Sequence, residues 1–482
     1  MPFPLIAIVI AIASFALNVI SALLRPKTSD RPDKDWDIPT ATEGRSIPVV
    51  WGTDLQRAPN IIWWGDQREV RRNNIWRYFV GIAWALAHGA PVLKSIIVNE
   101  KVIWTGALTH GQELFLNLPN LFGQAGGGII WDLKYYQGNG TVGADPYLAS
   151  RVSGYPDHRR VAYLVSRGPA TWSAGSNWKG FIGNSPNLPK VEFELERFPD
   201  VPSEGAIGGD ANPIWMLYEA LTNNVWGCGV DPADAFEGID DASFQSAANQ
   251  VAAEGLGASY ILQESMQFPR FADMILRHVD GVLYREPTNG KWTVKLIRDD
   301  YNPNQLLILD ETNIIEVQEF GTDISGVLRD VVRIKFADRT KQYKESVATF
   351  RNPAVRAIQG YSSAVELDFP MVRDPGVAQR IAEREALGYS YPLRRLRVTA
   401  TRKAANLRPG SVFRFVWAGY DVDAIFRVTS IRLGSPVDGV VIVEAVEDKF
   451  SIASTTIGAP PLPPPPPEDP PPPEDPPDDP PI

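Results

Sequence analysis

The stretch that decides the fold is IPVVWGTDLQRAPNIIWWGD, residues 47–66. Two short apolar runs, IPVVWG and NIIWWGD, flank a polar link that ends in Ala58-Pro59-Asn60. Both runs are rich in β-branched and aromatic residues, which pack well on the half-buried surface of a sheet. The stretch therefore predicts a hairpin-like pair of strands at the start of a β domain.

Beyond this stretch the secondary structure that the residue pattern predicts changes twice, from strands to helices and back to strands. Short alternating strands continue to about residue 198 and include a hairpin that turns at Asn99-Glu100. Pro, Gly and Asp then cluster at 199–211, and a helix follows with Asn212 as its N-cap. From about residue 311 short strands return at near-regular spacing, which is typical of a small barrel or sandwich.

Helix signals and one turn signal mark the middle and later parts of the chain. Two further helices are predicted at about 241–254, ended by Gly255, and at about 269–279. A two-residue hairpin turn is predicted at Asn289-Gly290. One more helix is predicted at 375–389, with Asp374 as its N-cap.

The pattern as a whole predicts a β-rich α+β fold, in which two small antiparallel β-barrel domains accompany one α+β domain. An apolar helix precedes these domains and a polyproline tail follows them. The predicted boundaries are 1–24 for the apolar helix, 25–46 for a linker, 47–198 for the first β-barrel domain with an insertion at about 106–157, 199–310 for the α+β domain, 311–452 for the second β-barrel domain and 453–482 for the acidic Pro-rich tail.

The two ends of the chain have unusual compositions. Leu5 to Leu24 is almost entirely apolar and, at about 1.5 Å per residue, is long enough for a hydrocarbon core of roughly 30 Å. This run is either a membrane span or a helix buried among protein partners. The tail from 453 alternates proline runs with acidic pairs, so it predicts an extended polyproline-like spacer.

Charge and residue chemistry argue against nucleic-acid binding and against catalysis. A net charge of −10 and a pI near 5.1 do not suit a surface that grips phosphates. The lone Cys228 is interpreted as a small buried residue, the glycine-rich loop Gly123 to Gly128 as a flexible loop, and Glu192, Glu194 and Glu196 as one face of a strand at a solvated edge or interface. The four histidines are scattered: His88, His110, His158 and His278. No catalytic, cofactor-binding or metal-ligating residue is predicted, and the protein is not expected to be an enzyme.

Several separated blocks resemble the baseplate hub and tail tip attachment proteins of long-tailed bacteriophages, including the hub region of lambda-like tip proteins and the hub proteins of gene transfer agents. The blocks cover roughly residues 40 to 450 and occur in the same order as in that family. They are PVVWGT with NIIWWGD, VNEKVIWTG, GNSPNLPKVEFEL, NPIWMLYEALTNNVWGCGVD, the run from Asn352 to Pro392, and EAVED.

This resemblance implies a structural protein at the virion tail tip, made in the host cytoplasm during assembly and working without a cofactor. The family's architecture implies a homotrimeric hub whose two β-barrels per subunit match a sixfold tail tube to a threefold tip. The hub would close the tube and form part of the conduit for DNA ejection, and DNA would pass without specific binding. The implied partners are a distal tail protein or tail tube ring, the C-terminus of the tape measure protein, other tail tip proteins and a central fibre or spike. The apolar run Leu5–Leu24 departs from that family: it would either lie in the lumen and hold the tape measure C-terminus, or enter a host membrane on infection.

Two other functions remain open from the sequence. A membrane-anchored scaffold of a bacterium or prophage would explain the apolar start and the proline tail, but not the blocks between them. A tail-associated peptidoglycan-degrading enzyme is the weaker alternative, because the chain has neither an HExxH motif nor a nucleophile elbow.

Overall fold

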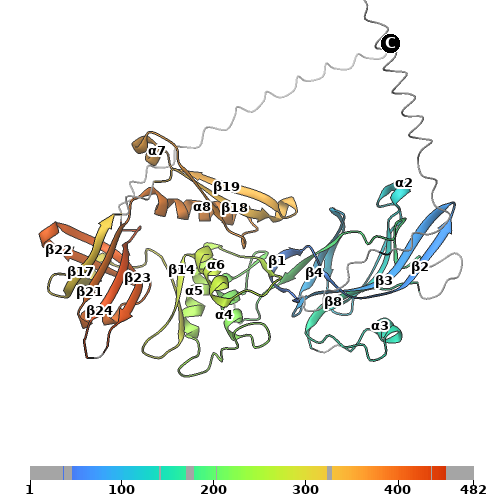
Figure 1. Ribbon diagram of the computed structural model, residues 1–482, viewed down its shortest axis with the longest axis horizontal. Helices are drawn as coiled ribbons and strands as arrows, with labels where there is room; N and C mark the ends of the chain where they lie inside the picture. The colour runs from blue at the N-terminus through green and yellow to red at the C-terminus, as the bar shows by residue number, and fades with distance from the viewer. Residues whose placement is uncertain are drawn as a thin grey trace, which may run out of the picture. The chain divides into compact units, whose positions relative to one another are not determined.

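The structure is a computed structural model that describes residue 36 and residues 46–140, 143–169, 178–201, 204–322, 328–435 and 437–451. The chain forms two compact units: unit 1 is Met1–Ile297 with Val327–Ser390, and unit 2 is Arg298–Gly326 with Tyr391–Ile482 (Figure 1). The predicted apolar helix 1–24, nearly all of the linker 25–46 and the tail 453–482 lie outside the described residues. None of the described helices is long and apolar enough to cross a membrane.

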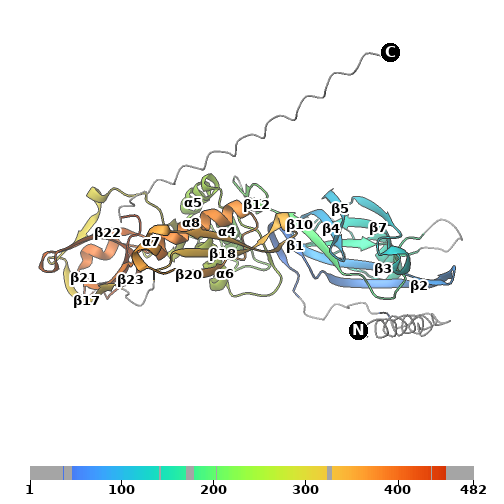
Figure 2. The same ribbon diagram turned by 90° about the horizontal axis from the view of Figure 1, so that it is seen from above.

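Unit 1 begins with two sheets that pack face to face (Figure 2). The order is β13-β1-β10-β4-β5 in the first sheet and β2-β3-β8-β7-β6 in the second, and β9 pairs with β3 and β7. Trp84 of the second sheet contacts Phe193 of the first, with ring centroids 5.7 Å apart. The strands are β1 (Val49–Gln56), β2 (Asn60–Arg72), β3 (Ile75–His88), β4 (Val92–Val98), β5 (Lys101–Leu108), β6 (Glu113–Leu118), β7 (Ile129–Tyr136), β8 (Val161–Ser166), β9 (Phe181–Gly183), β10 (Val191–Arg197) and β13 (Tyr260–Leu262), with short helices α2 (Gly123–Gly126) and α3 (Pro146–Arg151).

The predicted strand pair in residues 47–66 is wrong in its pairing, although both strands exist. β1 pairs with β10 and β13, whereas β2 pairs with β3 in the other sheet. Every residue of β1 is buried, so this strand needs cover on both faces and takes an interior position in its sheet. The real hairpin partner of β2 is β3, through a turn at Asn73-Asn74 in which both residues have positive φ.

A helical layer follows in unit 1, as the sequence predicts. It contains α4 (Pro213–Thr222), α5 (Asp241–Glu254) and α6 (Phe268–Val279). The side chain of Asn212 accepts a hydrogen bond from the backbone N–H of Ile214, which confirms it as the N-cap of α4. Gly255 ends α5 in the left-handed conformation. The short hairpins β11 (Ala206–Ile207) with β12 (Asp210–Ala211) and β14 (Gly281–Arg285) with β15 (Trp292–Leu296) flank the helices.

The predicted two-residue turn at Asn289-Gly290 is in fact longer. The last ladder pair is Arg285 with Trp292, and the N–H of Glu286 donates to the carbonyl of Lys291. The chain therefore turns over residues 287–290, with Gly290 in positive φ.

Residues 328–390 complete unit 1. They form the sheet β19-β18-β20 with two helices, and the elements are β18 (Val331–Asp338), η2 (Arg339–Lys341), β19 (Lys344–Arg351), α7 (Pro353–Gln359), β20 (Ala364–Asp368) and α8 (Pro375–Ser390). The side chain of Asp374 accepts from the N–H groups of Gly376 and Val377, as expected for the start of α8. Ile334 and Ile381 share one apolar core with α4, α5 and α6. This grouping differs from the predicted domain 311–452, because the hairpin packs with the helices and not with the later strands.

Unit 2 is a single six-stranded sheet of order β16-β22-β23-β24-β21-β17. Phe320 on β17 contacts Phe415 on β22, with ring centroids 5.8 Å apart, although three strands lie between them in the sheet order. The sheet therefore curls around its own core. Its elements are η1 (Pro303–Gln305), β16 (Leu307–Leu309), β17 (Ile314–Thr322), β21 (Arg394–Ala400), η3 (Arg402–Asn406), β22 (Val412–Trp417), η4 (Ala418–Tyr420), β23 (Val422–Leu433) and β24 (Val441–Glu447).

The predicted β-rich α+β class is confirmed by this architecture. Antiparallel pairing dominates, and only β16 with β22 and β18 with β20 run parallel among the described ladders. In the part of the chain that the structure describes, no strand pairing closes either β region into a complete barrel.

Candidate functional site

Strand β1 is the element that two apolar cores of unit 1 share. Val50 lies in the core between the two sheets, whereas Val49 and Trp51 lie in the core that contains α4, α5 and α6. Trp51 is 0% exposed, stacks on Phe271 at 5.1 Å between ring centroids, and donates from Nε1 to Oε2 of Glu219 at 2.7 Å. The apolar half of β1 therefore ties the sheets to the helices.

The polar half of β1 also links the sheets to another part of unit 1, through the buried ion pair between Asp54 and Arg373. Asp54 is 5% exposed and accepts two hydrogen bonds from Arg373, from Nε to Oδ1 at 2.9 Å and from Nη2 to Oδ2 at 2.7 Å. The remaining guanidinium nitrogen, Nη1, donates to the carbonyls of Pro370 and Val372. Burial alone would lower the pKa of Arg373, but the charge of Asp54 and its hydrogen bonds raise that pKa overall.

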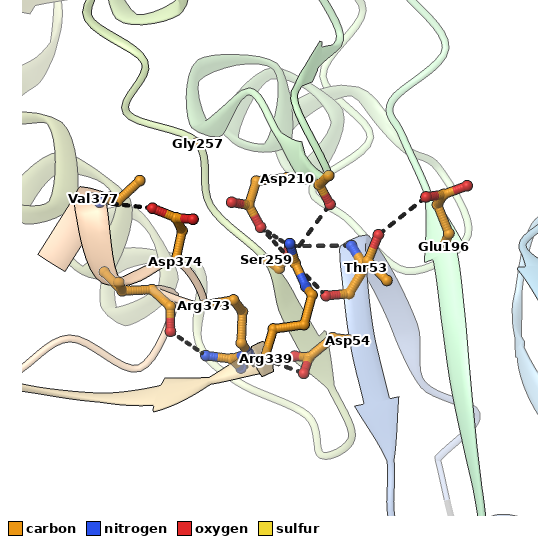
Figure 3. Close-up of polar contacts among 12 residues, drawn as sticks. Thr53, Asp54, Glu196, Asp210, Gly257, Ser259, Arg339, Arg373, Asp374 and Val377 are labelled. Carbon is orange, nitrogen blue, oxygen red and sulfur yellow. Dashed lines mark hydrogen bonds and ion pairs between the residues drawn. The ribbon is translucent and has the colours of Figure 1, made fainter. Parts of the chain in front are cut away.

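A second arginine from the same segment lies beside this pair (Figure 3). Nη2 of Arg339 forms an ion pair with Asp210 and donates to the Thr53 carbonyl at 3.0 Å and to Oγ of Ser259 at 3.1 Å. Burial lowers the pKa of Arg339, and the charge of Asp210 more than offsets this, so the pKa is raised. We call Asp54, Asp210, Ser259, Arg339 and Arg373 the polar junction.

The serine of the polar junction is fully hydrogen-bonded. Oγ of Ser259 donates to Oδ1 of Asp210 at 2.6 Å and accepts from the N–H of Thr53 at 3.1 Å. Gly52 makes this close approach possible, because its φ is +66° and a Cβ built on it would lie 2.0 Å from that Oγ. The hydroxyl is therefore a structural link between β1 and the segment after α5, and its proton is already committed to a carboxylate.

The predicted glutamate face is present on β10, but it is not an edge. β10 lies between β1 and β4 in the sheet, so it is not an edge strand, and Glu194 and Glu196 are hydrogen-bonded to side chains of other segments. Oε1 of Glu194 accepts from the hydroxyl of Tyr343 at 2.6 Å, and Glu196 accepts from Thr53 and Lys94. Burial and the charge of Glu194 raise the pKa of Tyr343, which keeps this phenol protonated. The solvated edge is wrong, and the interpretation of this face as an interface between subunits stays a prediction.

The structure differs from two smaller interpretations. Cys228 is exposed and not buried, because its segment turns back at the end of α4, where the Cys228 N–H donates to the carbonyl of Ala220. Partial burial raises the pKa of its thiol, so the thiolate is disfavoured. The loop Gly123 to Gly128 contains the four-residue helix α2 where a flexible loop was expected.

The histidines and carboxylates do not assemble into a metal centre within the described ranges: no group of three or more His, Cys, Asp or Glu side chains could hold an ion there. His278 is a buried residue of α6, and its Nε2 lies 3.1 Å from the carbonyl oxygen of Gly257. Burial lowers its pKa to about 4. What unit 1 presents is a set of structural ion pairs that lock three segments together.

Comparison with known proteins relates part of the chain to phage tails. Residues 328–431 match the family model described as putative phage tail protein. That match contains Arg339, Tyr343 and Arg373, whereas their partners Asp54, Glu194 and Asp210 lie outside it. No curated protein sequence matches the chain.

Solved structures are similar to a larger part of the chain than the family model matches. A chain from the virion of a native gene transfer agent particle shares the fold over 85% of both chains, with a TM-score of 0.50 and 15% sequence identity. A tail protein from Neisseria meningitidis MC58 is matched with 10% identity and a TM-score of 0.32, over 76% of this chain and 98% of that one. A 43 kDa tail protein of prophage MuSo2 from Shewanella oneidensis is matched with 11% identity and a TM-score of 0.31, over 75% and 99%. The predicted resemblance to phage tail proteins is confirmed, and a structural role in a tail is supported.

Proposed function

We propose that this relative of phage tail proteins is a baseplate hub, which assembles as a homotrimer at the tail tip and closes the tail tube. The observation that carries the proposal is the shared fold with the gene transfer agent virion chain, over 85% of both chains. The two β-rich regions of this chain would supply the six similar ring segments that three subunits need. A contact repeated three times closes such a ring.

The polar junction suits this role because each ring segment has to keep one shape for the ring to close. Arg339 and Arg373 belong to the family-matched segment, and their carboxylate partners come from β1 and β12. The buried bidentate pair of Asp54 with Arg373 is directional, so it favours one arrangement of the segments over others of similar apolar burial. The junction thus acts as a positioning device within each subunit.

The other parts of the proposal concern the lumen and its partners. The net charge of −10 suits a conduit that DNA crosses without binding. A distal tail protein or tube ring would meet one side of the hub. Leu5–Leu24 would either hold the tape measure C-terminus in the lumen or, as the alternative, enter a host membrane on infection. The other tail tip proteins and a central fibre or spike would meet the opposite side.

The symmetry of the assembly tests the hub. The full chain, co-expressed with its neighbouring tail genes, is expected to give trimers in mass photometry and threefold particles beside a sixfold ring in electron microscopy. A detergent-dependent monomer would instead support the membrane-anchored scaffold and would exclude the hub. The chain is expected to leave purified peptidoglycan intact, and release of muropeptides would favour the enzymatic alternative.

A further inference from the structure

The hairpin of β2 and β3 carries a group of arginines at its tip. β2 has 13 residues and β3 has 14, whereas their sheet neighbours β8 and β7 have six and eight. Arg68 pairs across the hairpin with Phe79, and Arg72 pairs with Ile75. Residues directly opposite in a ladder share a face, and so do alternate residues along a strand. Arg68, Arg72 and Arg77 therefore lie on one face of the tip, which we call the arginine face.

Two arginines of the arginine face, Arg72 and Arg77, lie over an aromatic ring. The guanidinium carbon of Arg72 lies 5.8 Å from the centroid of Trp178, and that of Arg77 lies 4.9 Å from it. Trp178 in turn packs edge-on against Phe79, and Ile75, which pairs with Arg72 across the hairpin, is exposed. The surface thus combines cations with an apolar platform.

The three arginines of the arginine face, Arg68, Arg72 and Arg77, have no carboxylate partner among the described residues. Arg339 and Arg373 of the polar junction, in contrast, each form an ion pair with an aspartate. Burial lowers the pKa of Arg77, and repulsion by Arg72 lowers it further. Like charges held this close raise the free energy of the free surface, so an incoming anion would gain by relieving the repulsion.

The chemistry of the face selects an extended acidic ligand with apolar groups between its charges. Guanidinium groups bind carboxylates through paired hydrogen bonds, and an indole face packs well against proline rings. The chain itself contains such a segment. Its final residues hold three acidic pairs separated by prolines: Glu468-Asp469, Glu474-Asp475 and Asp478-Asp479.

The spacing of the charges also fits. Arg68 and Arg72 are four residues apart on a strand, which corresponds to about 13 Å. Glu474 and Asp478 are also four residues apart, which corresponds to about 12 Å in a polyproline helix. Two successive acidic pairs can therefore meet two arginines of the face while the intervening prolines lie over Trp178.

We propose that the arginine face binds the acidic Pro-rich tail of this chain, from the same or a neighbouring copy. The occupant is a peptide and not a nucleic acid, because the acidic pairs and prolines match both halves of the face, and the chain carries one tail for each face. This interaction goes beyond the hub role and does not depend on it. It would hold the tail at the tip of the β2–β3 hairpin.

A direct binding measurement tests the proposal. The receptor is the full-length chain in which the six tail carboxylates are replaced by amides (E468Q, D469N, E474Q, D475N, D478N and D479N), so that its own tail does not compete. A fluorescein-labelled peptide of residues 460–482 is titrated with this receptor, and its anisotropy is followed at two salt concentrations. Saturable binding with one peptide per chain is expected, and it should weaken as salt rises.

Matched variants identify the surface. R72Q/R77Q in the same receptor should weaken peptide binding by about tenfold or more, since each arginine contributes charged hydrogen bonds. R333Q/R351Q, which changes two exposed arginines on β18 and β19, should bind like the parent receptor. Unchanged thermal midpoints for both variants would show that loss of binding is not loss of folding.

Three results would overturn the proposal. In one, R72Q/R77Q binds the peptide as well as the parent does. In another, a peptide with all six carboxylates amidated binds equally well. In the third, a single-stranded oligonucleotide with six phosphates binds more tightly than the acidic peptide, which would assign the face to nucleic acid.

Discussion

At the residue scale, the buried carboxylate of Asp54 is costly to place and shows what the polar junction requires. Taking an aspartate and an arginine out of water is costly, and the pair with Arg373 compensates only because both carboxylate oxygens and all three guanidinium nitrogens are hydrogen-bonded. A pair of this kind adds less to net stability than to the choice of one arrangement. Removing one partner, in contrast, lowers the stability strongly, because the other charge then stays buried without a counter-charge.

The first prediction follows from this asymmetry. Asp54→Asn should lower the free energy of unfolding of unit 1 by about 3 kcal/mol or more, because Arg373 remains buried without a counter-charge. Urea unfolding followed by intrinsic fluorescence measures the loss. Glu366→Gln is the control, since its ion pair with Lys335 is solvent-exposed and should leave the midpoint nearly unchanged. Equal effects of the two substitutions would contradict the role given to Asp54.

The buried histidine predicts an acid sensitivity with a defined window. The folded pKa of His278 is lowered to about 4, by burial first and by the charge of Arg384 second, whereas an unfolded histidine titrates near 6.5. The unfolded chain therefore binds the proton more readily between these values. The free energy of unfolding should therefore keep the full contribution of neutral His278 above about pH 6.5. It should fall by up to about 3 kcal/mol as the pH drops to 4.

His278→Gln removes this titration while it keeps a donor for the Gly257 carbonyl. Its unfolding free energy should therefore depend less on pH between 4.5 and 6.5 than that of the parent. His88 and His158 also have pKa values lowered by burial, so part of the slope should remain. A parallel pair of pH profiles would show that His278 is not the main titrating group.

At the scale of elements, the hairpins show where local signals suffice. The turn at Asn99-Glu100 is predicted from sequence and confirmed, with β4 and β5 on either side. Both turn residues have positive φ, which a two-residue turn of this type requires. Asparagine tolerates that conformation, whereas glutamate does so at a cost.

This cost gives a prediction for the β4–β5 turn. Glu100→Gly should stabilise unit 1 by about 1 kcal/mol, because glycine has no Cβ to clash at a φ of 64°. Glu100→Val should destabilise it, and Glu100→Gln should behave like the parent. Thermal unfolding of the three variants ranks them, and a valine variant as stable as the glycine variant would rule out backbone strain as the cause.

At the scale of the whole molecule, the two units have separate apolar cores. Phe193 lies in a core whose residues all belong to unit 1, and Phe413 lies in a core whose residues all belong to unit 2. Each of these side chains is 0% exposed. Energetic effects in one core should therefore be confined to its own unit.

Calorimetry of two alanine variants tests this separation. Phe413→Ala should destabilise unit 2 by about 3–5 kcal/mol and shift only one component of the heat-absorption trace, and Phe193→Ala should do the same for the other component. If each substitution moved both components equally, the chain would unfold as one cooperative body.

The sequence alone determined the local features of the fold, such as helix starts and the alternation of side chains along strands. α4 and α8 start where Asn212 and Asp374 cap them, and β10 alternates as predicted between buried Phe193 and polar Glu194. Such features follow from short-range hydrogen bonds and from side-chain periodicity. Only the tertiary structure decided the partner of β1, the grouping of residues 328–390 with unit 1, and the polar junction. Asp54 and Arg373 are 319 residues apart, and no local pattern carries the information that burial on both faces of β1 brings them together.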